Sequence, residues 1–310
     1  EVIVRLHYTG INYAEILSRK GLYDWMVKRP YILGMEGSGV IEGVGEGINR
    51  SRIGQKVMVG CQYGCYAEKV VIPEDQAIPT LKHLTMAENA AFLVNYLTAW
   101  ISLITLANLQ STEKVLITAA AGGVGTAAIQ LAANWGCSVY GLAGSSEKIE
   151  FINSLGATGG FNYREKGCFD RLRKKTGGVD VILEMVGGKV YKESFKSMNP
   201  LGRMTVAGFS SFNLQKWNPL SWLKTLRDLP KVNLLKLGHK SGGIMATHVG
   251  YLLKYPDKLM SLYNELRTFA SEKQIKPVIG STFPFDQAAA AHSLIESRQS
   301  IGKILLSHDN

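Results

Sequence analysis

The chain has 310 residues, more than one hydrophobic core usually organises, so we expect two domains. Its composition, 46% hydrophobic and 19% charged, excludes an intrinsically disordered chain. It contains no uncharged apolar run of about eighteen residues, the length that predicts a membrane-spanning helix. The formal charge of +10 suits an anionic ligand, but the basic residues form no dense block with interleaved aromatics, which argues against nucleic-acid binding.

The cysteines and the first residues indicate the compartment. Four cysteines are too few for a disulfide framework in a chain of this length, so we expect a reducing, cytoplasmic environment. Residues 1–5 predict a β-strand rather than a signal peptide. The sequence starts so abruptly at this strand that we expect further residues upstream of Glu1.

Two regions follow each other along the chain. Residues 1–95 combine glycines with short β-like runs separated by turn-forming residues, a pattern typical of a small β-barrel. From about residue 98 strands and helices alternate, which predicts right-handed βαβ units and a parallel sheet covered on both faces. The strands expected in this second region are 115–118, 138–140, a run near Phe161, 179–183 and 203–207.

The C-terminal part is predicted to return to the first domain. Residues 214–240 are irregular, with Trp217 and Trp222 among several lysines. Beyond them we expect a helix near 249–271, a strand around 275–283, a helix near 286–297 and a last strand at 303–306. The predicted architecture is a β-rich domain of residues 1–97, completed by 249–310, around a dinucleotide-binding domain of residues 98–248.

A glycine-rich turn provides the first functional indication. Residues 119–125, Ala-Ala-Ala-Gly-Gly-Val-Gly, follow a predicted strand and open a predicted helix. Glycines there allow a tight turn and close approach to a pyrophosphate, which the helix N-terminus attracts. Gly122, Gly123 and Val124 are therefore candidate cofactor contacts. The alternative is a tight strand–helix connection without a ligand.

The end of the second strand of this domain indicates which dinucleotide is bound. A site selective for NAD usually places an acidic residue there to bind the ribose 2′-hydroxyl. Here Ser145 and Ser146 come first, and Lys148 follows one turn into the predicted helix. These side chains suit a 2′-phosphate, so we expect NADP(H). Glu147 complicates this interpretation, and Lys148 as a plain surface lysine is the alternative.

Five ordered motifs resemble the medium-chain dehydrogenase/reductase superfamily, in its zinc-less quinone oxidoreductase branch. The motifs span residues 10–23, 34–40, 119–125, 161–165 and 302–306. Residues 93–100 and 275–277 are most similar to the VAT-1-like subgroup of synaptic vesicles. The resemblance implies an α/β protein in which a GroES-like β-barrel catalytic domain accompanies a Rossmann domain with a doubly wound parallel sheet.

Two departures from the zinc alcohol dehydrogenases bear on the chemistry. Where that family places a cysteine and a histidine as ligands of catalytic zinc, this sequence has Asn12 and Met35, which cannot do the same work. Cys61 and Cys65 are interpreted as packed thiols, because their spacing lacks two further ligands. We therefore expect no metal site.

The resemblance also implies roles for single residues. Asn12 would donate a hydrogen bond at the nicotinamide end, and Tyr23 would line the substrate pocket or supply a proton; a turn residue and a packing aromatic are the alternatives. Lys303 would reach the nicotinamide side or end a loop. The resemblance also implies cofactor contacts at Thr98 and Tyr163, and we expect Gly187 and Gly208 beside the cofactor because each lies at the end of a predicted strand.

These expectations converge on an NADPH-dependent, zinc-independent reductase of quinones or α,β-unsaturated carbonyls, present as a homodimer. Without a Lewis acid, the hydride must go to an acceptor that is already electrophilic. One alternative is a low-turnover NADP(H)-binding interaction protein, peripheral at membranes, which the basic and aromatic stretch 214–240 favours. Another is an enoyl-thioester reductase.

Overall fold

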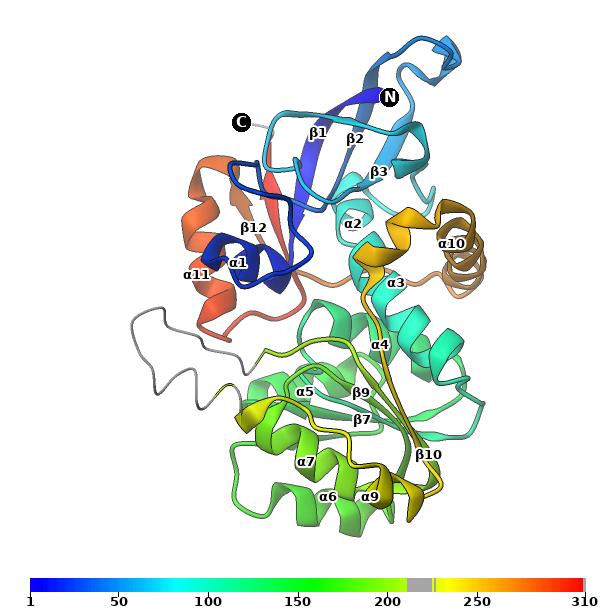
Figure 1. Cartoon of the computed structure of the whole chain (residues 1–310), viewed down its shortest axis with the longest axis vertical. Coiled ribbons are helices and arrows are strands. Elements are labelled where there is room, and N and C mark those ends of the chain that lie inside the picture. Colours follow the sequence, from blue (N-terminus) through cyan, green and yellow to red (C-terminus); the bar gives the residue numbers. More distant parts are fainter. Residues whose placement is uncertain (211–224, 226, 309–310) are drawn as a thin grey trace. The chain divides into compact units, whose positions relative to one another are not determined.

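The computed structural model describes residues 1–210, 225 and 227–308, and the α/β fold class predicted from the sequence is confirmed. The chain divides into two compact units (Figure 1). The first unit consists of residues 1–97 and 249–310, and the second consists of residues 98–248.

The first unit is built on a seven-stranded sheet in the order β12-β13-β1-β2-β3-β5, with β4 also paired to β1. Only β12 and β13 run parallel, and the other pairs are antiparallel. The strands are β1 (Val2–Ile11), β2 (Glu36–Val44), β3 (Lys56–Gly60), β4 (Lys69–Ile72), β5 (Ala77–Pro79), β12 (Ile279–Pro284) and β13 (Lys303–Ser307).

Alternation along β1 shows why this sheet forms. Val2, Val4 and Leu6 are buried, whereas Ile3 and Arg5 point to solvent, as the two-residue period of a strand requires. The helices of the unit and its boundary are α1 (Tyr13–Lys20), α2 (Met86–Ala90), α3 (Leu93–Trp100), α10 (Pro256–Glu272) and α11 (Ala288–Glu296). A π-helical segment, Ile101–Leu106, continues α3 into the second unit.

The second unit contains a six-stranded parallel sheet in the order β11-β10-β9-β6-β7-β8. Its strands are β6 (Lys114–Ile117), β7 (Ser138–Ala143), β8 (Gly159–Asn162), β9 (Val179–Glu184), β10 (Met198–Val206) and β11 (Gly243–Ala246). The chain order reverses between β6 and β9, the arrangement of a dinucleotide-binding fold, and ligands of such sheets bind beyond the carboxyl ends of the strands.

Helices cover both faces of this sheet, as the sequence predicts. They are α4 (Gly123–Asn134), α5 (Ser146–Ser154), α6 (Cys168–Thr176), α7 (Gly188–Lys196) and the short α9 (Leu234–Gly238). Figure 1 shows α4 on one side of the strands and α6 and α7 on the other. The central strands are apolar because both of their faces are covered: Val115, Leu116 and Ile117 of β6 are all fully buried.

Three sequence-based boundaries were wrong. The helix expected at 249–271 is a 3₁₀ segment, Val249–Lys254, followed by α10 from Pro256, because a proline is accommodated in the first turn of a helix and not in its interior. The strand expected from residue 275 begins at Ile279, after Pro277. The helix expected from residue 286 begins as α11 at Ala288, after a 3₁₀ turn.

Within the described residues, no helix combines the length and the apolar character needed to cross a membrane. Of the stretch 214–240, the residues Trp217 and Trp222 lie outside the described part of the chain.

Candidate functional site

The glycine-rich turn connects β6 to α4 in the second unit. Gly122 is the N-cap of α4, with φ −81° and ψ 177°, and no side chain caps this end of the helix. A Cβ atom on Gly122 would come no closer than 3.4 Å to another atom, so the backbone is open there. A Cβ atom on Gly125 would lie 2.4 Å from the carbonyl oxygen of Ala119, so this glycine is required for packing. The uncapped N–H groups suit an anion.

A buried carboxylate and two glycines lie at the ends of β9 and β10. The Oε1 atom of Glu184 accepts hydrogen bonds from the backbone N–H groups of Val186 (2.7 Å) and Gly187 (2.6 Å). Its Oε2 atom is buried with no partner among the described residues, and burial raises the pKa of Glu184 to about 7. Gly187 has φ +86°, which favours glycine, and a Cβ atom on Gly208 would meet nothing within 3.6 Å.

The end of β7 gathers two cationic side chains. Ser145 caps α5, its Oγ atom accepting a hydrogen bond from the backbone N–H of Lys148 at 3.3 Å. Burial lowers the pKa of Lys148, and the positive charge of Arg164 lowers it further. A Cβ atom on Gly144 would lie 3.1 Å from the Tyr163 hydroxyl and 3.3 Å from Arg164 Nε. Arg164, which directly follows Tyr163, was not predicted as a cofactor contact from the sequence.

The structure therefore brings most of the predicted cofactor contacts to one end of the parallel sheet. Gly122, Gly123 and Val124 follow β6, Ser145 to Lys148 follow β7, and Gly187 and Gly208 follow β9 and β10. Ser146 is exposed at the first position of α5. Open glycines, uncapped N–H groups and an unpartnered carboxylate oxygen fit a dinucleotide. Thr98 uses its backbone carbonyl to accept a hydrogen bond from the Ser102 hydroxyl at 2.6 Å.

A buried polar cluster occupies the first unit where β1 meets α1. Lys303 Nζ donates to Asn12 Oδ1 at 2.6 Å and forms a close ion pair with Glu36. Asn12 Nδ2 donates to Glu36 Oε1 at 3.1 Å and to Glu15 Oε1 at 3.3 Å. The backbone N–H groups of Asn12 (2.6 Å) and Met35 (3.1 Å) also donate to Glu15.

Burial determines the electrostatics of this cluster. Glu15 and Glu36 are fully buried, and Lys303 is 3% exposed. Burial raises the pKa of Glu15 to about 7, against the opposing effects of Lys303 and of the Asn12 hydrogen bonds. Both Nδ2 hydrogens of Asn12 are used within the cluster, so its amide orientation is fixed. The predicted donor role of Asn12 stays a prediction, and it requires one of these contacts to open.

Tyr23 lies after α1 and is partly buried. Its ring makes an edge contact with Trp25, with the centroids 6.3 Å apart. Burial raises the pKa of Tyr23 well above its ordinary value, and the neighbouring Glu15 raises it further. The Tyr23 hydroxyl therefore keeps its proton at neutral pH and can donate a hydrogen bond, but it is a poor proton source.

The two residues predicted to replace the ligands of catalytic zinc in the zinc alcohol dehydrogenases offer an amide and a thioether. Met35 is 6% exposed, and Asn12 belongs to the polar cluster. Cys61 and Cys65 are buried with their Sγ atoms 3.4 Å apart. Among the described residues, no three His, Cys, Asp or Glu side chains group closely enough to hold a metal ion.

Family comparisons assign both units. Residues 1–82 match the model of the alcohol dehydrogenase GroES-like domain, and residues 123–235 match that of the zinc-binding dehydrogenase family. The GroES-like and Rossmann folds implied by the resemblance are thereby confirmed.

Relatives and solved structures agree with this assignment. The chain is 32% identical to the human synaptic vesicle membrane protein VAT-1 homolog over 99% of its length and 78% of that protein. It is 30% identical to the rat quinone oxidoreductase, over 99% of this chain and 88% of the relative. The crystal structure of Escherichia coli quinone oxidoreductase complexed with NADPH is similar, with a TM-score of 0.85 and 27% identity, covering 99% of this chain and 91% of that one. The chain belongs to the medium-chain dehydrogenase/reductase superfamily and to its quinone oxidoreductase-like branch.

Proposed function

We propose that this chain is an NADPH-dependent, zinc-independent oxidoreductase that reduces quinones or α,β-unsaturated carbonyls. The observation that carries the proposal is the glycine-lined end of the parallel sheet, where an uncapped helix start accompanies the cations Lys148 and Arg164. The 30% identity to a quinone oxidoreductase over nearly the whole chain supports it.

NADPH is the preferred dinucleotide because the end of β7 is cationic. A ribose 2′-phosphate carries up to two negative charges, and Lys148 and Arg164 supply two positive ones. The exposed Glu147 repels a phosphate, but it also lies in the first turn of α5, where an acidic residue favours the helix dipole. Bound NADPH would supply a hydride, and Gly122 and Gly208 leave open space for it at the ends of β6 and β10.

We propose that the first unit supplies the hydrogen-bond donors that stabilise the reduced acceptor. Reduction by hydride leaves negative charge on a carbonyl oxygen, and a hydrogen-bond donor stabilises that charge. The Tyr23 hydroxyl keeps its proton at neutral pH and suits this role. Lys303 has three N–H groups, of which two are directed at Asn12 and Glu36, so it holds the Asn12 amide in one orientation.

Zinc independence is proposed from the chemistry of the available donors. Zinc sites in proteins use thiolate, imidazole and carboxylate ligands. Asn12 and Met35 provide an amide and a thioether, and the nearby carboxylates of Glu15 and Glu36 are already engaged by Asn12, Met35 and Lys303.

We also propose a homodimer that forms through the edge strand β11. Within the described residues, this strand pairs only with β10, so one edge carries backbone groups available to a second copy. Leu234 and Leu235 of the neighbouring α9 are 77% and 79% exposed, and a partner would cover apolar surface there. A light-scattering mass of a single chain would contradict the dimer.

The function is tested by NADPH oxidation with a panel of acceptors. The panel contains ortho- and para-quinones, α,β-unsaturated ketones, an enoyl thioester and, as the control, a saturated ketone. We expect turnover with quinones or enones, no turnover with the saturated ketone, and no effect of a metal chelator. Loss of activity with chelator would overturn zinc independence, and activity confined to the thioester would replace the proposed substrate class.

A further inference from the structure

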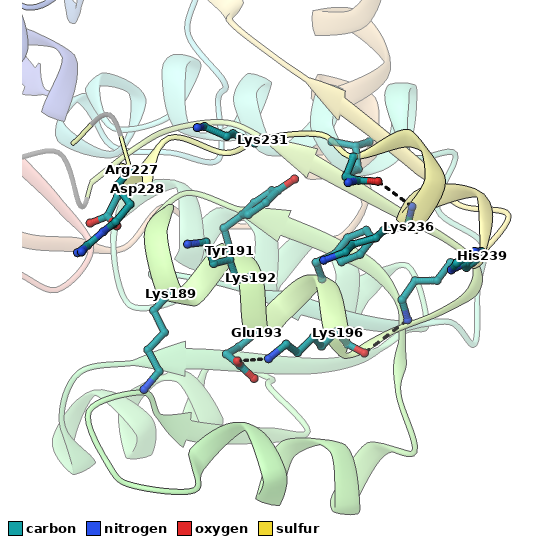
Figure 2. Close-up of a pocket in the computed structure, with 14 residues that line it drawn as sticks. Lys189, Tyr191, Lys192, Glu193, Lys196, Arg227, Asp228, Lys231, Lys236 and His239 are labelled. Carbon is teal, nitrogen blue, oxygen red and sulfur yellow. Dashed lines mark hydrogen bonds and ion pairs between the residues drawn. The ribbon is translucent and has the colours of Figure 1, made fainter. Parts of the chain in front are cut away.

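A basic cavity of about 870 Å³ lies in the second unit, along the side of α7 (Figure 2). One wall is α7 itself, which contributes Lys189, Lys192 and Lys196 at the spacing that places side chains on one helix face. The opposite wall is the segment that contains Lys231 and α9. This volume lies in the range typical of small-molecule sites.

The charge of the cavity is strongly unbalanced. Among the described residues, seven Lys or Arg side chains line it, against the two carboxylates of Glu193 and Asp228. Those carboxylates already pair inside the cavity, Glu193 with Lys196 at 2.7 Å and Asp228 with Arg227 at 3.7 Å.

Four lining lysines are left without a carboxylate partner. Among the described residues, no carboxylate lies within ion-pair distance of Lys189, Lys192, Lys231 or Lys236. The undescribed residues closest in sequence, 211–224 and 226, contain no Asp or Glu. Clustered like charges repel one another, so an anion bound among them is stabilised by more than one cation.

The floor of the cavity is apolar. Tyr191 is 6% exposed and rises from α7 toward the opposite wall, as Figure 2 shows. Phe195 and Ile244 also line the cavity, and Lys240 Nζ lies 5.8 Å from the centre of the Phe195 ring. The lining therefore combines aromatic and aliphatic side chains with several ammonium groups, which suits a compact carbon scaffold that carries anionic groups.

The cavity is distinct from the dinucleotide site, although both border α7. The predicted dinucleotide contact Gly187 is the N-cap of this helix, and Lys189 lies in its first turn, whereas Lys192 and Lys196 follow along its side toward the C-terminal end. Most of the cations are lysines, which bind phosphate as point charges, and the only guanidinium, that of Arg227, pairs with Asp228. We propose that this cavity binds a compact molecule or headgroup carrying two or more phosphate groups.

Calorimetric titration of the full chain tests the proposal, with inositol 1,4,5-trisphosphate as the probe and inorganic phosphate as the single-phosphate control. The variant is Lys192→Gln/Lys231→Gln. Its matched control is Lys174→Gln/Lys175→Gln, which removes the same charge from the exposed side of α6. We expect trisphosphate affinity to fall by at least about tenfold in the cavity variant and to change less than about twofold in the control.

Vesicles distinguish the two sources of such a ligand. One set contains phosphatidylinositol 4,5-bisphosphate, and the other contains phosphatidylserine at the same total charge. Lysine-dependent binding of the soluble probe, or of the bisphosphate vesicles alone, supports the site and identifies its source. Three outcomes would overturn it: equal losses of trisphosphate affinity in the two variants, vesicle binding that does not depend on Lys192 and Lys231 in the absence of trisphosphate binding, or no binding of either the trisphosphate or the bisphosphate vesicles.

Titration in the presence of excess NADPH separates this proposal from the proposed function. If the trisphosphate occupied the dinucleotide site, NADPH would displace it, and the cavity variant would bind it normally. We expect NADPH to leave the Lys192-dependent binding in place. Displacement by NADPH would overturn the cavity assignment without bearing on the reductase activity.

Discussion

Replacing Gly122 or Gly125 at the start of α4 by alanine is expected to have different effects. Gly125→Ala should lower the stability of the fold, and Gly122→Ala should lower the affinity for NADPH. In Gly125→Ala, the new Cβ atom would lie 2.4 Å from the Ala119 oxygen and 2.6 Å from the Ala120 oxygen, where ordinary contacts begin near 3.4 Å. Both neighbours are backbone atoms, which cannot rotate away. In Gly122→Ala, the nearest atom lies at 3.4 Å, and the backbone conformation of φ −81° and ψ 177° is open to alanine.

The magnitudes follow from these contacts. Overpacking costs about 1–3 kcal/mol, and the better helix propensity of alanine returns up to about 1 kcal/mol, so Gly125→Ala should lose roughly 1–2 kcal/mol. For a protein of this size, that lowers the melting temperature by about 2–8 °C. Gly122→Ala replaces one N-cap residue by a poorer one, at a cost of about 0.5 kcal/mol. Its new methyl group projects where a pyrophosphate would approach, so NADPH affinity should fall more than about tenfold.

Thermal unfolding without cofactor and fluorescence titration with NADPH measure the two effects separately. Gly238→Ala is the matched control, because a Cβ atom there would have no neighbour within 4 Å. It should change neither the melting temperature nor the affinity appreciably. A Gly122→Ala variant that binds NADPH as tightly as the unmodified chain would contradict the predicted role of Gly122. A Gly125→Ala variant as stable as Gly122→Ala would contradict the predicted packing role of Gly125.

Three further predictions concern charged residues. Lys303→Met leaves Glu36 buried without its cation and should cost about 3–5 kcal/mol in urea unfolding, part of which Lys303→Met/Glu36→Gln recovers. Burial raises the pKa of Glu15 to about 7 from an ordinary 4.5, so the folded chain holds a proton that the unfolded chain has released. The free energy of unfolding should therefore fall by roughly 3 kcal/mol as pH rises through this interval, and Glu15→Gln should remove that fall. Lys148→Ala and Arg164→Ala should each weaken NADPH binding more than NADH binding in parallel titrations.

Each of these has a clear opposite outcome. A Lys303→Met variant as stable as the unmodified chain would show that Glu36 is relieved in another way, for example by taking up a proton. A free energy of unfolding that rises between about pH 5 and pH 8, and does so only when Glu15 is present, would show that folding lowers the pKa of Glu15 instead of raising it. Equal losses of NADPH and NADH affinity would remove the 2′-phosphate role of Lys148.

Local patterns were sufficient to predict the parallel sheet. The central strands β6 and β9 are short apolar runs between turn-forming residues, and the glycine-rich turn between β6 and α4 marks the ligand end. The sixth strand, β11, was missed because Gly243–Ala246 has four residues, two of them small, and lacks a run of β-branched side chains. The π-helical continuation of α3 was also missed, because no sequence pattern predicts where the backbone hydrogen bonds of a helix change to the wider spacing of a π-helix.

The polar cluster of the first unit could not be predicted as a set, because long-range strand pairing creates it. The sequence predicted roles for Asn12 and Lys303 separately and none for Glu36. Hundreds of residues separate Asn12 from Lys303. In the fold, β1 pairs with β2 so that Gly10 faces Glu36, and with β13 so that Ile11 faces Ile304. The three side chains meet because their strands are neighbours in this register.

Gly10 is the one local sign of that meeting. A Cβ atom at this position would lie 2.8 Å from Lys303 Cε and 2.9 Å from Glu36 Cγ, so the glycine leaves the space through which both side chains reach Asn12. Glycine weakens the interior of a strand, and its presence in β1 often marks a place where another group approaches closely. Gly10 therefore indicates where in the sequence the cluster forms. The register of β1, β2 and β13 determines which charged side chains, those of Glu36 and Lys303, occupy the space that this glycine leaves.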